Sequence, residues 1–255
     1  MAEADKQKGR IFLHRGDLAQ ARVCYEQALK DDRQDDSPQA LSDTLGNLGN
    51  ICAMLGDYQE AEQCYREILD IQRRQQDKTA IGQTLVNLGN LQAEAGRPDR
   101  AKAYYLEALD ILEPLQDRRA LGVLYSTLAL QEAAAGSTDL AIVNFTKALD
   151  LHRAVGDEEG LAIAYSQLGK TFLEAGKREQ AEKCLNNASE HYIKLGNEPA
   201  EASVLRLLGN LYVQAVNIES AIRCLERVVL LDARYGLSQQ SDDVANLKRL
   251  VQGDV

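Results

Sequence analysis

The chain has 255 residues, of which 45% are apolar and 27% are charged, a composition that is typical of globular proteins and excludes disordered and collagen-like ones. Its formal net charge is −10 and its isoelectric point is near 4.9, which disfavours nucleic acid and anionic lipid as partners because phosphate-binding surfaces are basic. No apolar run reaches the roughly 20 residues of a membrane helix, and residues 1–10 lack the apolar stretch of a signal peptide. We therefore expect a cytoplasmic protein with no membrane insertion.

The chain has five cysteines, an odd number, and no Cys-x-x-Cys pair, so we expect neither a disulfide framework nor a thiolate metal site. The chain has no Trp, three Phe and four Pro, whereas Ala, Leu, Gln and Glu, which lose little freedom in a helix, are abundant. An all-helical chain in a reducing compartment is predicted.

A period of 40 residues runs through the chain and defines its elements. An alanine, a glycine and a large apolar residue recur at this spacing, as in Ala21, Ala61, Ala101, Ala141, Ala181 and Ala221. We predict six units of two helices: residues 1–36 with a shortened first helix, 37–76, 77–116, 117–156, 157–196 and 197–236, followed by a capping helix over 240–252. Since each unit buries its apolar face only against its neighbours, residues 1–255 are expected to form a single domain.

Each unit carries start and stop signals for its helices. The first helix follows a residue whose side chain can accept from free backbone N–H groups: Ser37, Asp77, Asp117, Asp157 or Asn197. It ends at a glycine that can adopt a positive φ: Gly16, Gly56, Gly96, Gly136 or Gly176. The second helix starts one residue later, where Asp57 and Glu60 have the spacing of a capping box.

The last unit departs from this pattern, because Val216 occupies the glycine position. The turn is then either strained at a positive φ or rebuilt with ordinary φ, and we favour the rebuilt turn, in which Asn217 caps the next helix and Val216 is buried against the terminal helix. The terminal helix should present one apolar face, with Asp243, Asn246 and Arg249 outside it: Val244, Leu247, Leu250 and Val251.

The repeating residues resemble the tetratricopeptide repeat, stretched from its common length of about 34 residues to 40. The motif is Leu45, Leu48-Gly49, Gly56, Tyr58, Ala61, Tyr65 and Ile68-Leu69. With Asn47-Leu48-Gly49-Asn50 and the same four residues at 87–90, it is similar to the Pins adaptors, kinesin light chains and many bacterial repeat proteins. The resemblance implies an all-α, right-handed superhelical solenoid of helix-turn-helix repeats whose concave side is lined by the first helices.

The sequence indicates no catalytic residue, metal site or cofactor, and we predict that the protein is not an enzyme. His14, His152 and His191 lie in different repeats, and we expect each at a helix end or on the surface. Four cysteines share one repeat position, which indicates a half-buried packing site: Cys24, Cys64, Cys184 and Cys224. The densest acidic run is expected in a solvated connection and lacks the spacing of a calcium loop: Asp31, Asp32, Asp35 and Asp36.

A groove along the first helices is the candidate binding site. The residues expected to face it are Asn47, Asn50, Asn87, Asn90, Val123, Leu130, Ile163, Gln167, Lys170, Arg206 and Asn210. An Asn side chain both donates and accepts, so it suits the alternating N–H and C=O groups of an extended peptide. In Pins and kinesin light chain repeats such asparagines hold peptide backbones, and the resemblance carries this role to Asn50, Asn90 and Asn210.

Structural roles compete with these assignments. Asn47 and Asn87 are as well suited to bonding a neighbouring backbone as to contacting a ligand. Val123, Leu130 and Ile163 form either an apolar pocket for an anchoring side chain or, slightly favoured, packing against the fifth repeat. The resemblance does not extend to the tetratricopeptide co-chaperones that grip an acidic C-terminus, whose carboxylate clamp needs a Lys four positions before the groove asparagine. Only Arg206 with Asn210 fits that spacing here, so we do not expect a carboxylate clamp.

The sequence therefore predicts a non-catalytic adaptor that binds a peptide or partner segment, neutral to basic in charge, in its concave groove. The alternative is a structural scaffold that oligomerises with copies of itself through its uncapped N-terminal repeat.

Overall fold

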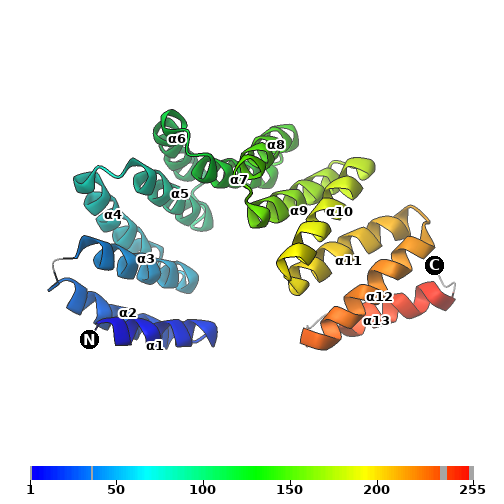
Figure 1. The fold of residues 1–255 in the computed structure, drawn as a ribbon, viewed down its shortest axis with the longest axis horizontal. Coiled ribbons are helices and arrows are strands. Elements are labelled where there is room, and N and C mark those ends of the chain that lie inside the picture. The colour runs from blue at the N-terminus through cyan, green and yellow to red at the C-terminus, as the bar shows by residue number, and fades with distance from the viewer. Residues whose placement is uncertain (1, 36, 236–239, 253–255) are drawn as a thin grey trace. The chain divides into compact units, whose positions relative to one another are not determined.

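The computed structural model describes residues 2–35, 37–235 and 240–252. Within these ranges the chain forms thirteen α-helices and no strand, which confirms the all-α prediction (Figure 1). The helices are α1 (Ala2–His14), α2 (Leu18–Asp32), α3 (Pro38–Leu55), α4 (Tyr58–Gln75), α5 (Lys78–Glu94), α6 (Pro98–Leu115), α7 (Arg118–Ala134), α8 (Thr138–Ala154), α9 (Glu158–Glu174), α10 (Arg178–Leu195), α11 (Glu198–Gln214), α12 (Ile218–Tyr235) and α13 (Gln240–Gln252). The repeat ends predicted at 36 and 236, and Asp36 of the acidic run, lie outside the described residues.

The chain divides into two compact units, residues 1–120 and 121–255. Unit 1 contains α1–α6, and unit 2 contains α8–α13 with most of α7, whose first turn spans the boundary. In unit 1 each helix packs against the helix that follows it, from α1 on α2 to α5 on α6, and α8–α13 follow the same rule in unit 2. The packing is therefore local in sequence within each unit, while the single domain stays a prediction.

The predicted N-caps of the first helices are confirmed. The side chains of Ser37, Asp77, Asp117, Asp157 and Asn197 each accept a hydrogen bond from the backbone N–H three residues later, over 3.0–3.4 Å. The capping box at Asp57 is wrong, because its side chain makes no capping bond. The Asp57 and Glu60 carboxylates instead accept charge-assisted bonds from the Arg22 guanidinium, at 2.7 and 2.5 Å.

The turns inside the helix pairs have one geometry, including the turn that lacks glycine. Gly16, Gly56, Gly96, Gly136 and Gly176 have φ of 70–83°, as predicted. The expectation of a rebuilt turn is wrong, because Val216 has φ 58° and its side chain is 77% exposed. The Asn217 N–H bonds to the Tyr212 carbonyl at 2.9 Å, as the Asp57 N–H does to Cys52 at 2.8 Å, so the same closing bond imposes the left-handed conformation on valine. Asn217 caps α12 as predicted, accepting from the Ser220 N–H at 3.3 Å.

Close approach of the two helices in a pair explains the Leu-Gly motif. The buried Tyr105 ring of α6 lies under Gly89 of α5, where an added Cβ would be only 2.3 Å from the ring. Tyr65 lies in the same way under Gly49, with an added Cβ 3.2 Å from the ring. The small residue of the first helix therefore makes room for the aromatic residue of the second.

The terminal helix α13 packs on α12, but its buried face differs from the prediction. Leu250 is buried in a cluster with Ala221 and Leu225. Asp243, which was expected outside the face, is only 5% exposed, and Val251 is exposed. The reason is an ion pair, since the Asp243 carboxylate lies 2.7 Å from Nε of Arg206 on α11.

Two buried polar clusters bear on further expectations, and the first corrects one of them. Asp32 is the last residue of α2 rather than part of a solvated loop, and it is buried against Lys6 at 2.8 Å and the Thr44 hydroxyl at 2.5 Å. His152 lies in the last turn of α8, at a helix end as expected, and it is only 2% exposed. Its ring occupies space that Cβ atoms at Gly122 and Gly160 would fill, at 2.9 and 2.2 Å from its atoms, so these glycines permit its burial.

Candidate functional site

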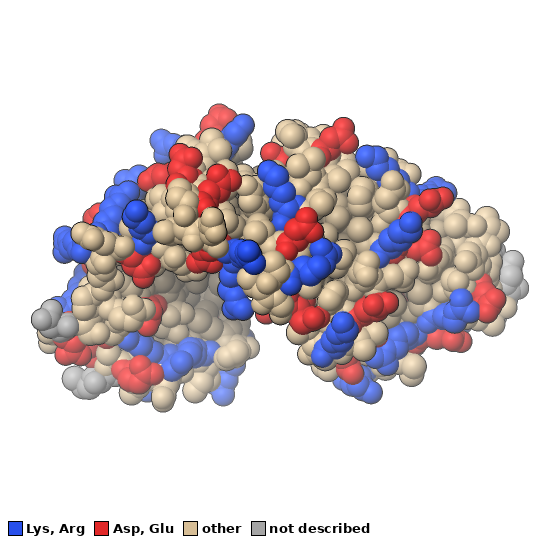
Figure 2. All heavy atoms as spheres, turned by 45° about the horizontal axis from the view of Figure 1, so that its top comes forward, with Lys and Arg blue, Asp and Glu red and all other residues tan. Residues whose placement is uncertain are grey.

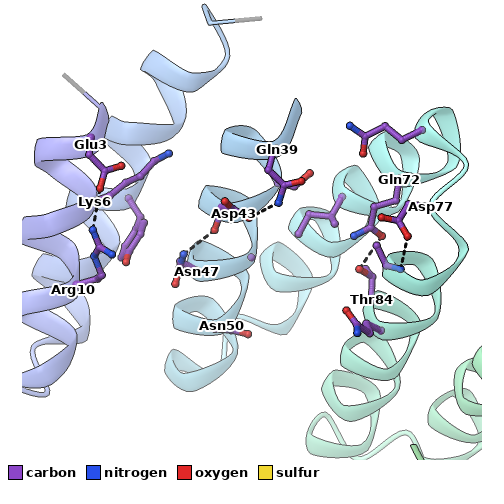
Figure 3. A pocket seen from close by; sticks show the side chains of 17 residues that line it. Glu3, Lys6, Arg10, Gln39, Asp43, Asn47, Asn50, Gln72, Asp77 and Thr84 are labelled. Carbon is purple, nitrogen blue, oxygen red and sulfur yellow. Dashed lines mark hydrogen bonds and ion pairs between the residues drawn. The ribbon is translucent and has the colours of Figure 1, made fainter. Parts of the chain in front are cut away.

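A cavity of about 640 Å³ in unit 1 is bounded by the first helices α1, α3 and α5 and is also lined by side chains of α2 and α4 (Figure 3). Charged groups on the α1 wall are already paired within the chain. Nη2 of Arg10 bonds to the Glu3 carboxylate at 2.9 Å, and Lys6 is held by Asp32. This wall therefore offers a ligand little uncompensated charge.

The α3 wall presents two asparagines one helical turn apart. Nδ2 of Asn47 donates to the backbone carbonyl of Asp43 at 2.7 Å (Figure 3). Asn50 is exposed, and its Oδ1 accepts from the Tyr65 hydroxyl at 2.5 Å. Each amide thus has one end fixed by the protein and the other end open to the cavity.

The α5 wall repeats part of this arrangement. Gln83 of α5 and Gln72 of α4 line the same cavity, and the Thr84 hydroxyl donates to Oε1 of Gln72 at 2.9 Å. A second cavity of about 360 Å³ shares Asn50 with the first and is lined by Asn87 and Asn90. Oδ1 of Asn90 accepts from the Tyr105 hydroxyl at 2.8 Å, which is the counterpart of the bond at Asn50. The structure thus brings four predicted site residues to two adjoining cavities: Asn47, Asn50, Asn87 and Asn90.

The two tyrosines were not predicted as site residues. Burial raises the pKa of Tyr65 and of Tyr105 to about 12, so both hydroxyls remain protonated and can donate at neutral pH. A sequence signal exists, because each Tyr follows its Gly-Asn pair at the same spacing in the second and third repeats. In the last three repeats the position is occupied by residues without a hydroxyl: Phe145, Leu185 and Leu225.

The remaining predicted site residues belong to unit 2. The side chains of Val123, Leu130 and Ile163 are 48, 40 and 42% exposed, on the first helices α7 and α9. Gln167 is half-buried, whereas Lys170 and Asn210 are exposed.

Arg206, the one residue with the spacing of a carboxylate clamp, is engaged within the chain. Its Nη2 lies 2.6 Å from both carboxylate oxygens of Asp232, and its Nε lies 2.7 Å from Oδ2 of Asp243. A ligand carboxylate would have to compete with two carboxylates that are already in place.

His152 has polar partners on both ring nitrogens. Nδ1 donates to the Asp157 carboxylate at 2.9 Å, and Nε2 lies 3.5 Å from the Ser126 hydroxyl. The order Ser126, His152, Asp157 resembles the nucleophile, base and orienting acid of a catalytic triad. The ring is nevertheless buried beneath two helices, and Asp157 also caps α9, so we assign the cluster to packing between α7, α8 and α9.

Charge on the surface is mixed. On the faces that Figure 2 shows, Lys and Arg are interspersed with Asp and Glu, and no broad area has a single sign. Among the described residues, no group of three or more His, Cys, Asp or Glu side chains could hold a metal ion. No helix in the described ranges has both the length and the apolar character needed to cross a membrane.

Comparison with known families and structures matches this architecture. A family model described as tetratricopeptide repeat matches residues 1–74, 40–113 and 120–194, and a second model of that description matches residues 166–236. No curated protein matches the sequence.

Solved structures with a similar fold have distant sequences. BtubC (BKLC) from P. vanneervenii has a TM-score of 0.77 at 20% identity, covering 86% of this chain and 92% of that one. PilW, a type IV pilus biogenesis factor, has a TM-score of 0.65 at 20% identity, covering 96% of this chain and 98% of that one. A Rap protein complexed with Competence and Sporulation Factor has a TM-score of 0.67 at 11% identity, covering 96% of this chain and 73% of that one. At these identities the likeness concerns the fold alone.

Proposed function

Because the chain belongs to the tetratricopeptide-repeat family, whose repeats generally mediate protein–protein interaction, we propose that it is a non-catalytic adaptor that binds an extended segment of a partner protein. The segment lies along the first helices of unit 1, over the two cavities that share Asn50. The Rap protein of similar fold is itself complexed with a factor, which supports a binding role for such a scaffold.

The observation that carries this proposal is the set of amides along α3 and α5. Asn47, Asn50, Asn87 and Asn90 line adjoining cavities with a combined volume suited to a short stretch of chain. Amides can pair with main-chain N–H and C=O groups whatever the ligand's side chains are. The ion-paired α1 wall adds no strong preference for ligand charge, so the net charge of −10 favours a neutral or basic segment.

Unit 2 offers a separate candidate contact surface for a partner protein. Val123, Leu130 and Ile163 expose apolar surface on first helices, where an apolar anchor of the partner could be desolvated. Gln167, Lys170 and Asn210 are the polar candidates on the first helices α9 and α11, while Arg206 remains committed to Asp232 and Asp243.

Replacing Asn50 and Asn90 together by Ala tests the proposal. Peptides selected from a displayed random library on the wild-type chain serve as probes, with affinity measured by isothermal titration. We expect the double variant to lose roughly 1–3 kcal/mol of binding free energy, because two hydrogen bonds to the ligand main chain are removed. Helical content by circular dichroism should stay unchanged, since both side chains lie at the cavity surface.

The matched control is Asn187→Ala, which removes a half-buried asparagine of α10 whose Nδ2 donates to the Lys183 carbonyl. It should leave peptide affinity intact. Unchanged binding in the Asn50/Asn90 variant, combined with a lower melting temperature, would assign these residues to the fold and defeat the adaptor proposal. Mass that grows with concentration in sedimentation, without any peptide being selected, would favour the self-associating scaffold.

A further inference from the structure

We infer that Tyr65 and Tyr105 are positioning residues that hold the amides of Asn50 and Asn90 with their N–H donors toward the cavities, so that these two positions select hydrogen-bond acceptors, above all main-chain carbonyl groups. The inference rests on the proposed function of unit 1, and it names the polarity that the ligand must present.

The geometry begins with the buried rings. Tyr65 and Tyr105 lie in the second helices α4 and α6, and their rings pass under Gly49 and Gly89 of the first helices. Their hydroxyl groups thereby reach the asparagine next to each glycine, with Oη to Oδ1 distances of 2.5 Å at Asn50 and 2.8 Å at Asn90. A buried ring has few alternative rotamers, so the hydroxyl is a fixed anchor for an otherwise mobile surface side chain.

The direction of these bonds decides what the amides offer. A protonated tyrosine donates to Oδ1, and the rigid, planar amide group then directs Nδ2 away from it. Asn47 has the reverse arrangement, because its Nδ2 donates to the Asp43 carbonyl and leaves Oδ1 as its open group. One turn of α3 therefore presents an acceptor at Asn47 and a donor at Asn50, which together complement the N–H and C=O groups of an extended chain.

The sequence confines this device to unit 1. Where the tyrosine is replaced by Phe145, Leu185 or Leu225, the neighbouring groove position is Leu130, Lys170 or Asn210. Only Asn210 keeps the amide, and its repeat has no hydroxyl at the anchoring position. We therefore assign main-chain recognition to Asn50 and Asn90 rather than to all three.

The orientation of the amides can be tested without a ligand. In the full chain, Tyr65→Phe and Tyr105→Phe each remove one hydroxyl and leave the ring that supports the helix pair. We expect the side-chain amide resonances of Asn50 to move in the first variant and those of Asn90 in the second, as measured by NMR. The control is Tyr192→Phe, which removes the hydroxyl of a buried tyrosine of α10 that lines neither cavity. Unmoved amide resonances in the two test variants would overturn the inference.

The second readout is affinity for a peptide selected on the wild-type chain. The double variant Tyr65→Phe/Tyr105→Phe should raise the Kd about three- to tenfold, since the amides lose their fixed orientation, whereas Tyr192→Phe should not. Asn50→Asp/Asn90→Asp still accepts from both hydroxyls but offers no N–H donor, so it should abolish binding even if the Phe variants fold poorly. Wild-type affinity in the folded Phe or Asp variants would overturn the inference. Failure to select any peptide would instead defeat the proposed function, while the amide resonances still decide the orientation.

Discussion

Val216 is the residue whose backbone departs most from its own preference. A β-branched side chain at φ 58° clashes with its neighbouring carbonyl, and because Val216 is exposed, no packing compensates for the clash. The left-handed conformation destabilises the folded state by about 1–2 kcal/mol for a residue other than glycine. Glycine would relieve this strain, but its greater conformational freedom in the unfolded chain offsets part of the gain.

We therefore predict that Val216→Gly raises the free energy of unfolding by about 0.5–1 kcal/mol. Urea unfolding followed by circular dichroism measures this change. Val216→Thr, which keeps the β-branch, is the control and should bring no gain. A fall in stability with glycine would show that the turn is relaxed in solution.

The same residue marks a limit of sequence reasoning. The glycine series predicted five left-handed turns correctly, because glycine is the residue that such a turn prefers. At Val216 the residue type argued for ordinary φ, but the turn is fixed by the helices that it joins and by the bond from Asn217 to Tyr212. Gln76 and Gln116, in the connections between repeats, likewise have positive φ values of 59° and 53°. Glycine occupies the equivalent position in the later repeats, at Gly156 and Gly196. Local preference therefore yields to the geometry of the repeat.

At the scale of elements, α13 is attached to the last repeat by an ion-pair cluster that contains more negative than positive groups. One guanidinium, that of Arg206, lies between two buried carboxylates, Asp232 and Asp243. Removal from water, together with the neighbouring Asp232, raises the pKa of Asp243 above its usual value despite the attraction of Arg206.

The sign of the resulting pH dependence follows from proton binding. With a raised pKa, the folded state holds the Asp243 proton more tightly than the unfolded state does. The contribution to stability is therefore greatest below the usual pKa of an aspartate and is lost as pH rises through the raised pKa. We predict that docking of α13 weakens as the pH rises through the raised pKa of Asp243.

Asp243→Asn should remove this dependence while still accepting a bond from Arg206. The measurement is the urea midpoint at a series of pH values, compared between wild type and variant, so that contributions common to both cancel. Parallel pH profiles would contradict the assignment to Asp243.

Existence and type of these elements could be predicted from the sequence, whereas several of their contacts could not. Caps such as Ser37 and Asn197 depend on atoms within one turn, and they were predicted correctly. The burial of Asp243 depends on Arg206, which lies in another helix, and no local pattern indicates that pairing. The tyrosine anchors of the candidate site were missed for the same reason, since the bond joins two helices of a pair.

At the scale of the whole molecule, the helices pack on their neighbours in the sequence. This holds for α1–α6 of unit 1 and for α8–α13 of unit 2. In such an arrangement stability is a sum of repeat and nearest-neighbour contributions rather than the property of one shared core. The division into two compact units agrees with this. A destabilising substitution in unit 1 should therefore lower the stability of the neighbouring helices and leave that of unit 2 unchanged.

The buried ion pair of the first repeats provides the test. Asp32→Ala would leave Lys6, whose side chain is only 14% exposed, without its carboxylate and would remove the acceptor of the Thr44 hydroxyl. Breaking a buried pair from one side costs about 3–5 kcal/mol. We expect native-state hydrogen exchange to accelerate in α1–α3 and to remain unchanged in α9–α12, with Asp35→Ala, an exposed acid of the following turn, as the silent control. Equal loss of protection in both units would show that the chain unfolds as one cooperative body, and the nearest-neighbour account would then be wrong.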